Sequence, residues 1–301
     1  MSEVRPPRRD QGRSRRHRPE PLRSAMAKRG PAGIQSSGTA LSSRPGRKPR
    51  DTGRWVYGRH AVTAALANPE RRWRRLVVLP GHEEEAAALV AGAQATRRGD
   101  DEAVGVLDHY SLAAILPDAA VHQGFALEVE PLPEHDLQDL LLRVGATGRR
   151  SIAVVLDRPS DPHNVGAVLR SAAAFGAFAV IISAHHAPPI TGTLAKAASG
   201  ALECVPLVRA VNLARALDRL KATGFWICGL DEAAPQPLAE LDLGERVAIV
   251  LGSEGSGIRR LVRERCDYFA RLPTGSAQPS LNLSTAAAVA LYELVRGHGV
   301  S

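Results

Sequence analysis

From residue 151 onward, short runs of consecutive apolar residues alternate with segments of helical periodicity. The strands predicted from these runs lie at residues 152–156, 179–182, 225–229 and 246–251. Strands that are apolar throughout are buried on both faces, and their alternation with helices is typical of a parallel sheet covered by helices on both sides. We therefore expect an α/β domain over residues 151–301. Ligands of such domains bind outside the carboxyl ends of the strands, so the loops that follow strands are the informative ones.

Residues 54–130 predict a second, smaller α/β unit. The pattern indicates helices at 59–67 and 83–97 and a strand at 125–129 that alternates with period two. Residues 131–150 contain prolines and an acidic amphipathic stretch, and they predict a linker with one helical segment.

The N-terminus of the chain is strongly basic. The whole chain has a formal net charge of +8, yet residues 1–50 hold 14 Lys and Arg against three Asp and Glu. Residues 1–53 are also rich in proline and poor in apolar residues, so we expect a disordered tail that cannot bury enough surface to fold. Two interpretations stay open: an arm that contacts RNA, and a solvated extension. A targeting helix is disfavoured by the low apolar content.

Several function classes are disfavoured by what the sequence lacks. No run of 18 uncharged apolar residues predicts a transmembrane helix, and no apolar segment near the N-terminus predicts a secretory signal. The three cysteines lie far apart without a CxxC pair, and no His, Cys and carboxylate cluster has the spacing of a metal site. We therefore expect a cytoplasmic protein without a metal, a membrane anchor or a disulfide framework.

One segment of the smaller unit combines cations with an aromatic residue. Four arginines surround Trp73, a composition that suits phosphate contact and base stacking. The predicted RNA-binding residues are Arg71, Arg72, Arg74 and Arg75. The alternative is a solvated loop in front of a strand.

The first informative loop, residues 157–166, follows an apolar run and opens a helix. Asn164 occupies the position expected for the N-cap, and its simplest role is capping. Arg170 lies six residues later among glycine and alanine neighbours, which leaves room for a partner to approach. The alternative for Arg170 is a structural ion pair.

The second loop, residues 251–257, has three glycines in six residues and Glu254 at its tip. Its order, GxxGxG, is neither a Walker A motif nor a dinucleotide fingerprint, and the alternative is a plain turn. The third loop, residues 273–284, places Ser280 and Asn282 two positions apart, so that they point the same way in an extended segment. Ser284 is a candidate cap for the following helix, and no His or Asp at triad spacing supports a serine nucleophile.

Together these loops resemble the SpoU (TrmH-type) family of RNA ribose 2′-O-methyltransferases, within the SPOUT superfamily. The similarity spans roughly residues 54–300 and rests on three motifs in order: DRPSDPHNVGAVLRSAAAFG (157–176), VLGSEGSGI (250–258) and LPTGSAQPSLNLSTAAAVAL (272–291). KAASGALECVPLV (196–208) is also similar to the family. GRHAVTAAL (58–66) and HQGFALEV (122–129) resemble the ribosomal-protein-like RNA-binding domain of the large-subunit rRNA members.

The resemblance implies a trefoil-knotted catalytic domain, the cofactor S-adenosylmethionine, and a homodimer whose sites draw on both subunits. It implies 2′-O-methylation of a guanosine in 23S rRNA. The residues carried over as catalytic are Asn164, Arg170, Glu254, Ser280 and Asn282. Those carried over as cofactor contacts, largely through the backbone, are Gly252, Leu272 and Leu281.

The chemistry agrees with these residue types, because a ribose hydroxyl must be positioned in line with the methyl group and must lose its proton. Arg170 either handles that proton with help from a substrate phosphate or only positions and stabilises the oxygen, since a guanidinium alone stays protonated. Two other functions stay open: methylation of a tRNA guanosine, and a non-catalytic RNA-binding or ribosome-assembly factor of the same fold.

Overall fold

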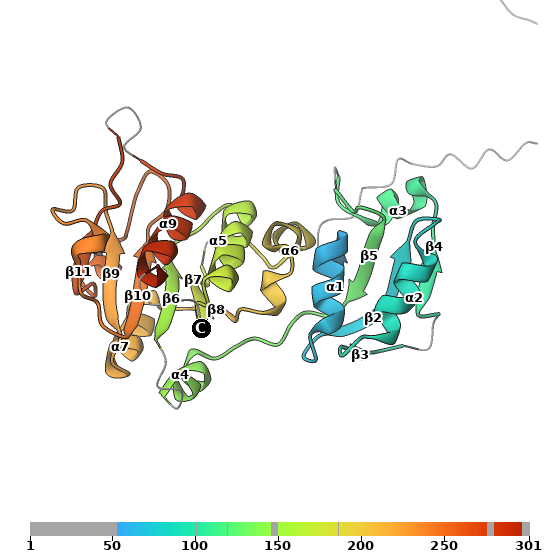
Figure 1. The fold of residues 1–301 in the computed structure, drawn as a ribbon, viewed down its shortest axis with the longest axis horizontal. Coiled ribbons are helices and arrows are strands. Elements are labelled where there is room, and N and C mark those ends of the chain that lie inside the picture. Colours follow the sequence, from blue (N-terminus) through green and yellow to red (C-terminus); the bar gives the residue numbers. More distant parts are fainter. Residues whose placement is uncertain are drawn as a thin grey trace, which may run out of the picture. The chain divides into compact units, whose positions relative to one another are not determined.

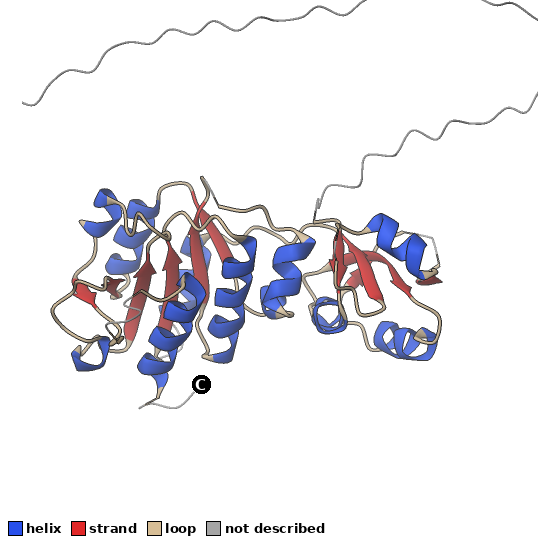
Figure 2. Ribbon diagram, turned by 90° about the horizontal axis from the view of Figure 1, so that it is seen from above, coloured by secondary structure: helices blue, strands red, loops and turns tan. Residues whose placement is uncertain are grey.

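The computed structural model of the chain describes residues 53–99, 102–118, 120–145, 150–185, 187–275 and 280–296. The predicted basic tail, residues 1–53, lies outside these ranges except for Gly53. Two units are built from the described residues, each around a β-sheet (Figures 1 and 2).

The large unit contains a six-stranded sheet in which every pair of neighbouring strands is parallel. Its strands are β6 (Ser151–Leu156), β7 (Ala179–Ser183), β8 (Leu207–Ala210), β9 (Trp226–Leu230), β10 (Arg246–Leu251) and β11 (Tyr268–Ala270). The order across the sheet is β11-β9-β10-β6-β7-β8. From β6 the chain continues to β7 on one side of the sheet, and from β10 it continues to β11 on the other side. The loops after β6 and β10 therefore meet at the topological switch point, where ligands bind in open α/β sheets. The parallel α/β architecture expected from the apolar runs is confirmed.

Helices cover both faces of this sheet, so the central strands β6, β7 and β10 are buried on both sides. Ile152, Val154 and Leu156 of β6 belong to one apolar cluster, and Ala153 and Val155 belong to the other. The first cluster includes α5 (Pro162–Ala174), α6 (Gly192–Ala198) and α9 (Leu283–Val295). The second includes α4 (Leu137–Gly145), α7 (Leu213–Ala222) and the short α8 (Arg260–Arg263). Two short 3-10 helices, η1 (Ala201–Glu203) and η2 (Leu238–Glu240), join these elements.

The small unit has a mixed sheet of β1 (Trp55–Tyr57), β2 (Arg72–Val78), β3 (Thr96–Arg97), β4 (Val104–Val106) and β5 (Phe125–Val129). Its helices are α1 (Arg59–Ala67), α2 (Glu83–Ala91) and α3 (His109–Ile115). The helix expected over 83–97 ends at Ala91, where Gly92 caps it, and only Thr96 and Arg97 of the remaining residues form a strand, β3.

Candidate active site at the carboxyl ends of the central strands

The loops after β6 and β10 are joined by a buried carboxylate. The Asp157 side chain is fully buried, and its oxygens accept hydrogen bonds from the backbone N–H of Arg259 (2.9 Å) and from the Arg259 Nε (2.7 Å). The Asp157 N–H donates to the carbonyl of Leu251 at 2.8 Å. The position of the glycine loop, residues 252–258, therefore depends on the loop that follows β6.

Helix α5 begins three residues earlier than an N-cap at Asn164 predicts. Asp161 is its N-cap, since the carboxylate accepts the His163 N–H at 2.8 Å, and Pro162 takes the first helical position, where a missing N–H costs nothing. The prediction that Asn164 is the N-cap was therefore wrong. Because Asp161 does the capping, the Asn164 amide is available for another contact.

The glycine loop is a tight reversal of the chain. Ser253 and Gly257 exchange backbone hydrogen bonds of 2.9 and 3.2 Å, which leaves Glu254 at the tip. Gly255 and Gly257 adopt left-handed φ angles of 88° and 63°, and a Cβ on Gly252 would lie 2.1 Å from the carbonyl carbon of Gly257. The three glycines are thus required by the shape of the loop.

Glu254 is the point at which the three predicted loops meet. Its Oε1 accepts one hydrogen bond from the Asn164 Nδ2 and one from the Asn282 Nδ2, both at 3.0 Å. The Asn282 Oδ1 also accepts the Ser284 N–H at 2.9 Å and caps α9, so the predicted cap Ser284 is replaced by Asn282. We call these three side chains the Glu254 clamp.

A pocket of about 500 Å³ opens beside this clamp. Its lining includes the three residues predicted to contact a cofactor, Gly252, Leu272 and Leu281, together with Glu254 and Ser280. Asn164, Asn282 and Arg170 are not among the lining residues.

The pocket combines apolar walls with carboxylates. Leu230, Leu251 and Ile258 contribute apolar surface. Asp231 lies in the lining too, and its hydrogen bond from the Arg263 Nη1 at 2.6 Å holds the pKa of this carboxyl below its ordinary value. The pocket thus has both apolar and ionisable groups in its lining, and its volume is in the range of small-molecule sites.

Arg170 lies away from the pocket. Six helical residues separate it from Asn164, a rise of about 9 Å along α5. Its side chain is exposed, and no hydrogen bond or ion pair joins it to another residue within the described ranges. The structural ion pair considered from the sequence is therefore not found in this part of the chain.

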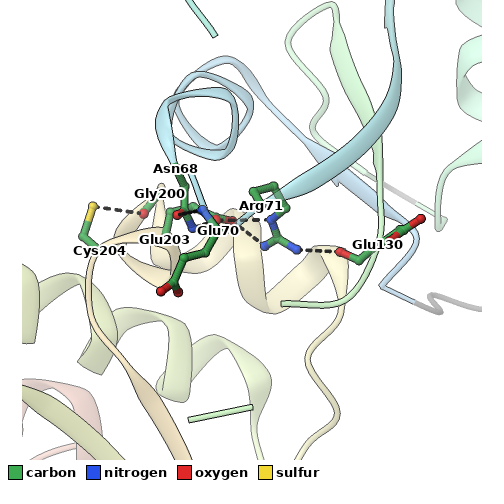
Figure 3. Close-up of polar contacts among 7 residues, drawn as sticks. All are labelled: Asn68, Glu70, Arg71, Glu130, Gly200, Glu203 and Cys204. Carbon is green, nitrogen blue, oxygen red and sulfur yellow. Dashed lines mark hydrogen bonds and ion pairs between the residues drawn. The ribbon is translucent and has the colours of Figure 1, made fainter. Parts of the chain in front are cut away.

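The arginine cluster of the small unit divides into a buried and an exposed part. Residues 72–78 form a strand, so alternate side chains face opposite ways: Trp73 is buried, with its Nε1 donating to the Ala95 carbonyl at 3.3 Å. Arg71, just before the strand, is also buried, and its guanidinium donates to Glu203 and to the Glu130 carbonyl (Figure 3). Base stacking on Trp73 and phosphate contact by Arg71 have to be withdrawn, because neither side chain reaches the surface.

The other three arginines, Arg72, Arg74 and Arg75, are exposed. Arg75 donates to Glu128 at 2.9 Å and lies over the Trp55 ring, 5.6 Å from its centroid. Burial would raise the pKa of Glu128, but hydrogen bonds from Arg54 and Arg75 outweigh it and hold that pKa below its ordinary value. The sequence reasoning missed Arg54 and Trp55, which only the pairing of β1 with β5 brings beside the cluster. It also missed Asp157, although an Asp directly after a buried strand was visible in the sequence.

Among the described residues, no group of three or more His, Cys, Asp or Glu side chains has a metal-binding arrangement. Within the same ranges, each helix is too short or too polar to cross a bilayer.

Comparison with known proteins assigns families to both units. Residues 151–292 match the SpoU rRNA methylase family, and residues 55–135 match the RNA 2′-O ribose methyltransferase substrate binding family. A 23S rRNA (guanosine-2′-O-)-methyltransferase RlmB of Vibrio vulnificus is 38% identical over 80% of this chain and 96% of its own length. An uncharacterised tRNA/rRNA methyltransferase of Synechocystis is 37% identical over 81% of this chain, which spans only 62% of that protein.

Solved structures share the fold. The SpoU methyltransferase AviRb of Streptomyces viridochromogenes superposes with a TM-score of 0.66 at 25% identity, over 82% of this chain and 91% of its own. The crystal structure of an RNA 2′-O ribose methyltransferase gives a TM-score of 0.63 at 24% identity, over 82% of this chain and 90% of that one.

Proposed function

Because the chain belongs to the SpoU rRNA methylase family, we propose that it transfers a methyl group from S-adenosylmethionine to the ribose 2′-hydroxyl of a guanosine in 23S rRNA. The observation that carries the proposal is the Glu254 clamp: residues from three loops far apart in the chain converge on one carboxylate beside a pocket. The names of the relatives that align over almost their whole length support 23S rRNA and guanosine as the substrate.

The pocket fits the cofactor. Leu230, Leu251 and Ile258 provide apolar contacts for an adenine ring, and the acidic rim is compatible with a sulfonium and an ammonium group. Gly252, Leu272 and Leu281 would hold the cofactor through their backbones. When bound, S-adenosylmethionine supplies an electrophilic methyl group.

The protein's own residues position the ribose and handle its proton. Glu254, fixed by Asn164 and Asn282, is an acceptor whose orientation is set before substrate arrives, and Ser280 adds a hydroxyl at the pocket wall. Arg170 stays protonated, so we assign it to phosphate or ribose-oxygen contact and stabilisation of the developing negative charge.

A second copy of the chain would complete the site. Arg170 is exposed and about 9 Å along α5 from Asn164, on a helix face that also carries the short side chains of Ala167 and Ala174. On the neighbouring α9, Val289 and Tyr292 are exposed apolar residues. We infer that these faces of α5 and α9 pack against a partner subunit, which brings Arg170 to the partner's pocket. The knot of the catalytic domain stays a prediction.

RNA would be held by the small unit and the tail. Arg72, Arg74 and Arg75 are exposed, with Arg75 over the Trp55 ring, and the basic residues 1–50 add sequence-independent affinity for phosphate. We place the reaction in the cytoplasm, where ribosomal RNA is accessible. We divide the chain at residues 53, 130 and 150 into the tail, the small unit, the linker and the catalytic unit.

The test is methyl transfer by the purified chain, with a labelled methyl donor, to undermodified 23S rRNA and to tRNA, followed by mapping of the modified nucleotide. We expect label on a guanosine of 23S rRNA and none with Glu254→Gln. Label on tRNA alone would replace the substrate, and RNA binding without cofactor binding in calorimetry would indicate a non-catalytic RNA-binding factor.

A further inference from the structure

Glu203, at the end of η1 in the large unit, is surrounded by side chains of the small unit. Its Oε2 accepts from the Asn68 Nδ2 at 2.8 Å and from the Arg71 Nε at 3.2 Å, and its Oε1 accepts from the Arg71 Nη2 (Figure 3). The Glu203 and Arg71 side chains are only 3% and 4% exposed. This ion pair is part of neither the pocket nor the Glu254 clamp, although Glu203 belongs to the segment 196–208 that resembles the family.

Further contacts surround the pair. The Lys196 Nζ donates to the Gln123 Oε1 at 2.8 Å, and the Tyr57 hydroxyl lies 3.3 Å from the Thr193 Oγ1. A Cβ on Gly200 would lie 2.6 Å from the Ala64 Cβ, so the backbone of the large unit approaches α1 as closely as a glycine permits. Helix α6 and η1 therefore form a fitted platform for the small unit.

The burial of the ion pair determines how strongly it holds the two units together. An exposed pair between two units contributes little and forms and breaks freely. A buried pair is different, because removal of one partner leaves an uncompensated charge in a buried site. Arg71 spends a third donor on the Glu130 carbonyl at 2.9 Å, so its position is set from the small unit as well.

We propose that Glu203, Arg71 and Asn68 form a positioning device that fastens the small unit to the large unit of the same chain, so that RNA held on the small unit is presented to the active site. Arg71 thereby acts on the reaction without touching RNA. The inference rests on the proposed function for its kinetic part only, because the fastening itself is measured without substrate.

The first experiment measures the distance between the units in the full chain. Spin labels are placed at Tyr110→Cys in the small unit and Val211→Cys in the large unit, whose side chains are 86% and 76% exposed, with Cys204→Ser to remove the exposed native thiol. We expect one narrow distance distribution, and a broad one after Glu203→Gln or Arg71→Met. In the double variant Arg71→Met with Glu203→Leu no buried charge remains, so its distribution is no broader than that of either single variant.

The second experiment separates positioning from loss of structure. With Glu203→Gln, kcat on 23S rRNA falls at least tenfold, while KM for RNA stays within threefold and cofactor affinity within twofold. The matched control is Glu240→Gln, since Glu240 also ends a three-residue 3-10 helix but is exposed; it changes none of these quantities.

Narrow distance distributions in both single variants would overturn the proposal, as would a distribution in the double variant that is broader than in either single variant. A loss of cofactor affinity in Glu203→Gln that parallels its loss of kcat would also overturn it. If the unaltered chain transfers no methyl group to rRNA, the proposed function fails, and the distance measurements still decide whether the pair fastens the two units.

Discussion

Asn282 has two contacts that substitutions can separate. Its Oδ1 caps α9, and its Nδ2 donates to Glu254. Asn282→Ala removes both contacts. Asn282→Asp keeps an oxygen for the cap but replaces the amide donor with a second carboxylate, so it removes only the contact to Glu254.

The expected magnitudes differ for stability and activity. Loss of an N-cap costs about 1 kcal/mol, which lowers the Tm of a chain of this size by about 2–4 °C. Asn282→Ala should show this loss, and Asn282→Asp should retain most of the stability. A hydrogen bond to a charged group contributes about 1.5–3 kcal/mol, so both variants should lose about 10- to 100-fold in kcat/KM.

Calorimetric unfolding and methyl transfer to rRNA measure the two effects. The matched control is Asn212→Ala, because Asn212 caps α7 by accepting the Arg215 N–H at 3.1 Å and is not part of the pocket lining. This control should lose the same stability and keep its activity. Full activity in Asn282→Asp with loss in Asn282→Ala would refute the reasoning, since capping alone would then explain the role of Asn282.

Three further results are expected. Arg170→Ala and Glu254→Gln chains should each be inactive at an unchanged Tm. If Arg170 reaches the partner's pocket, each mixed dimer has one intact site, so a refolded equimolar mixture should recover up to about a quarter of wild-type activity. No recovery would place both residues in the site of one chain. Deletion of residues 1–53 should weaken binding to unrelated RNAs and reduce the slope of log K against log salt by about 0.7–0.9 for each phosphate that the tail neutralises in the full chain, with kcat at saturating RNA retained; an unchanged slope would leave the tail without a role in binding. Burial raises the pKa of the Cys228 and Cys266 thiols to about 12, so at pH 8 both are almost entirely protonated. A thiol reagent should therefore modify only the exposed Cys204 in the native chain and all three cysteines after unfolding. Rapid reaction of two thiols in the native chain would contradict this.

The parallel sheet was predictable because its strands are short, continuous and apolar. Residues 246–251 formed a strand with the predicted bounds, and α1 did the same over 59–67. Local capping was harder to predict. Asp161, Asn164, Asn282 and Ser284 are all residues that cap helices well, so the local sequence alone does not decide which of them begins each helix. Tertiary contacts decide between them, because each of the two asparagines places its amide on Glu254.

The exposure of the arginines was not readable from composition. Trp73 and its arginine neighbours indicated a nucleic-acid surface, but the strand alternation turns the indole into the core. Arg71 escapes this alternation because it precedes the strand, and its partner Glu203 lies 132 residues away in the sequence. Local patterns do not show contacts of this separation.

Because of the Glu254 clamp, methyl transfer depends on contacts between distant parts of the chain. The hydrogen bonds that orient Glu254 span 90 and 28 residues, and the Asp157–Arg259 contact spans 102. Helices and turns survive partial unfolding more readily than contacts of such range, because distant segments lose chain entropy when they are brought together. With rising denaturant, catalysis should therefore disappear before the far-ultraviolet circular dichroism changes, and the returning activity during refolding should mark the slowest step of assembly.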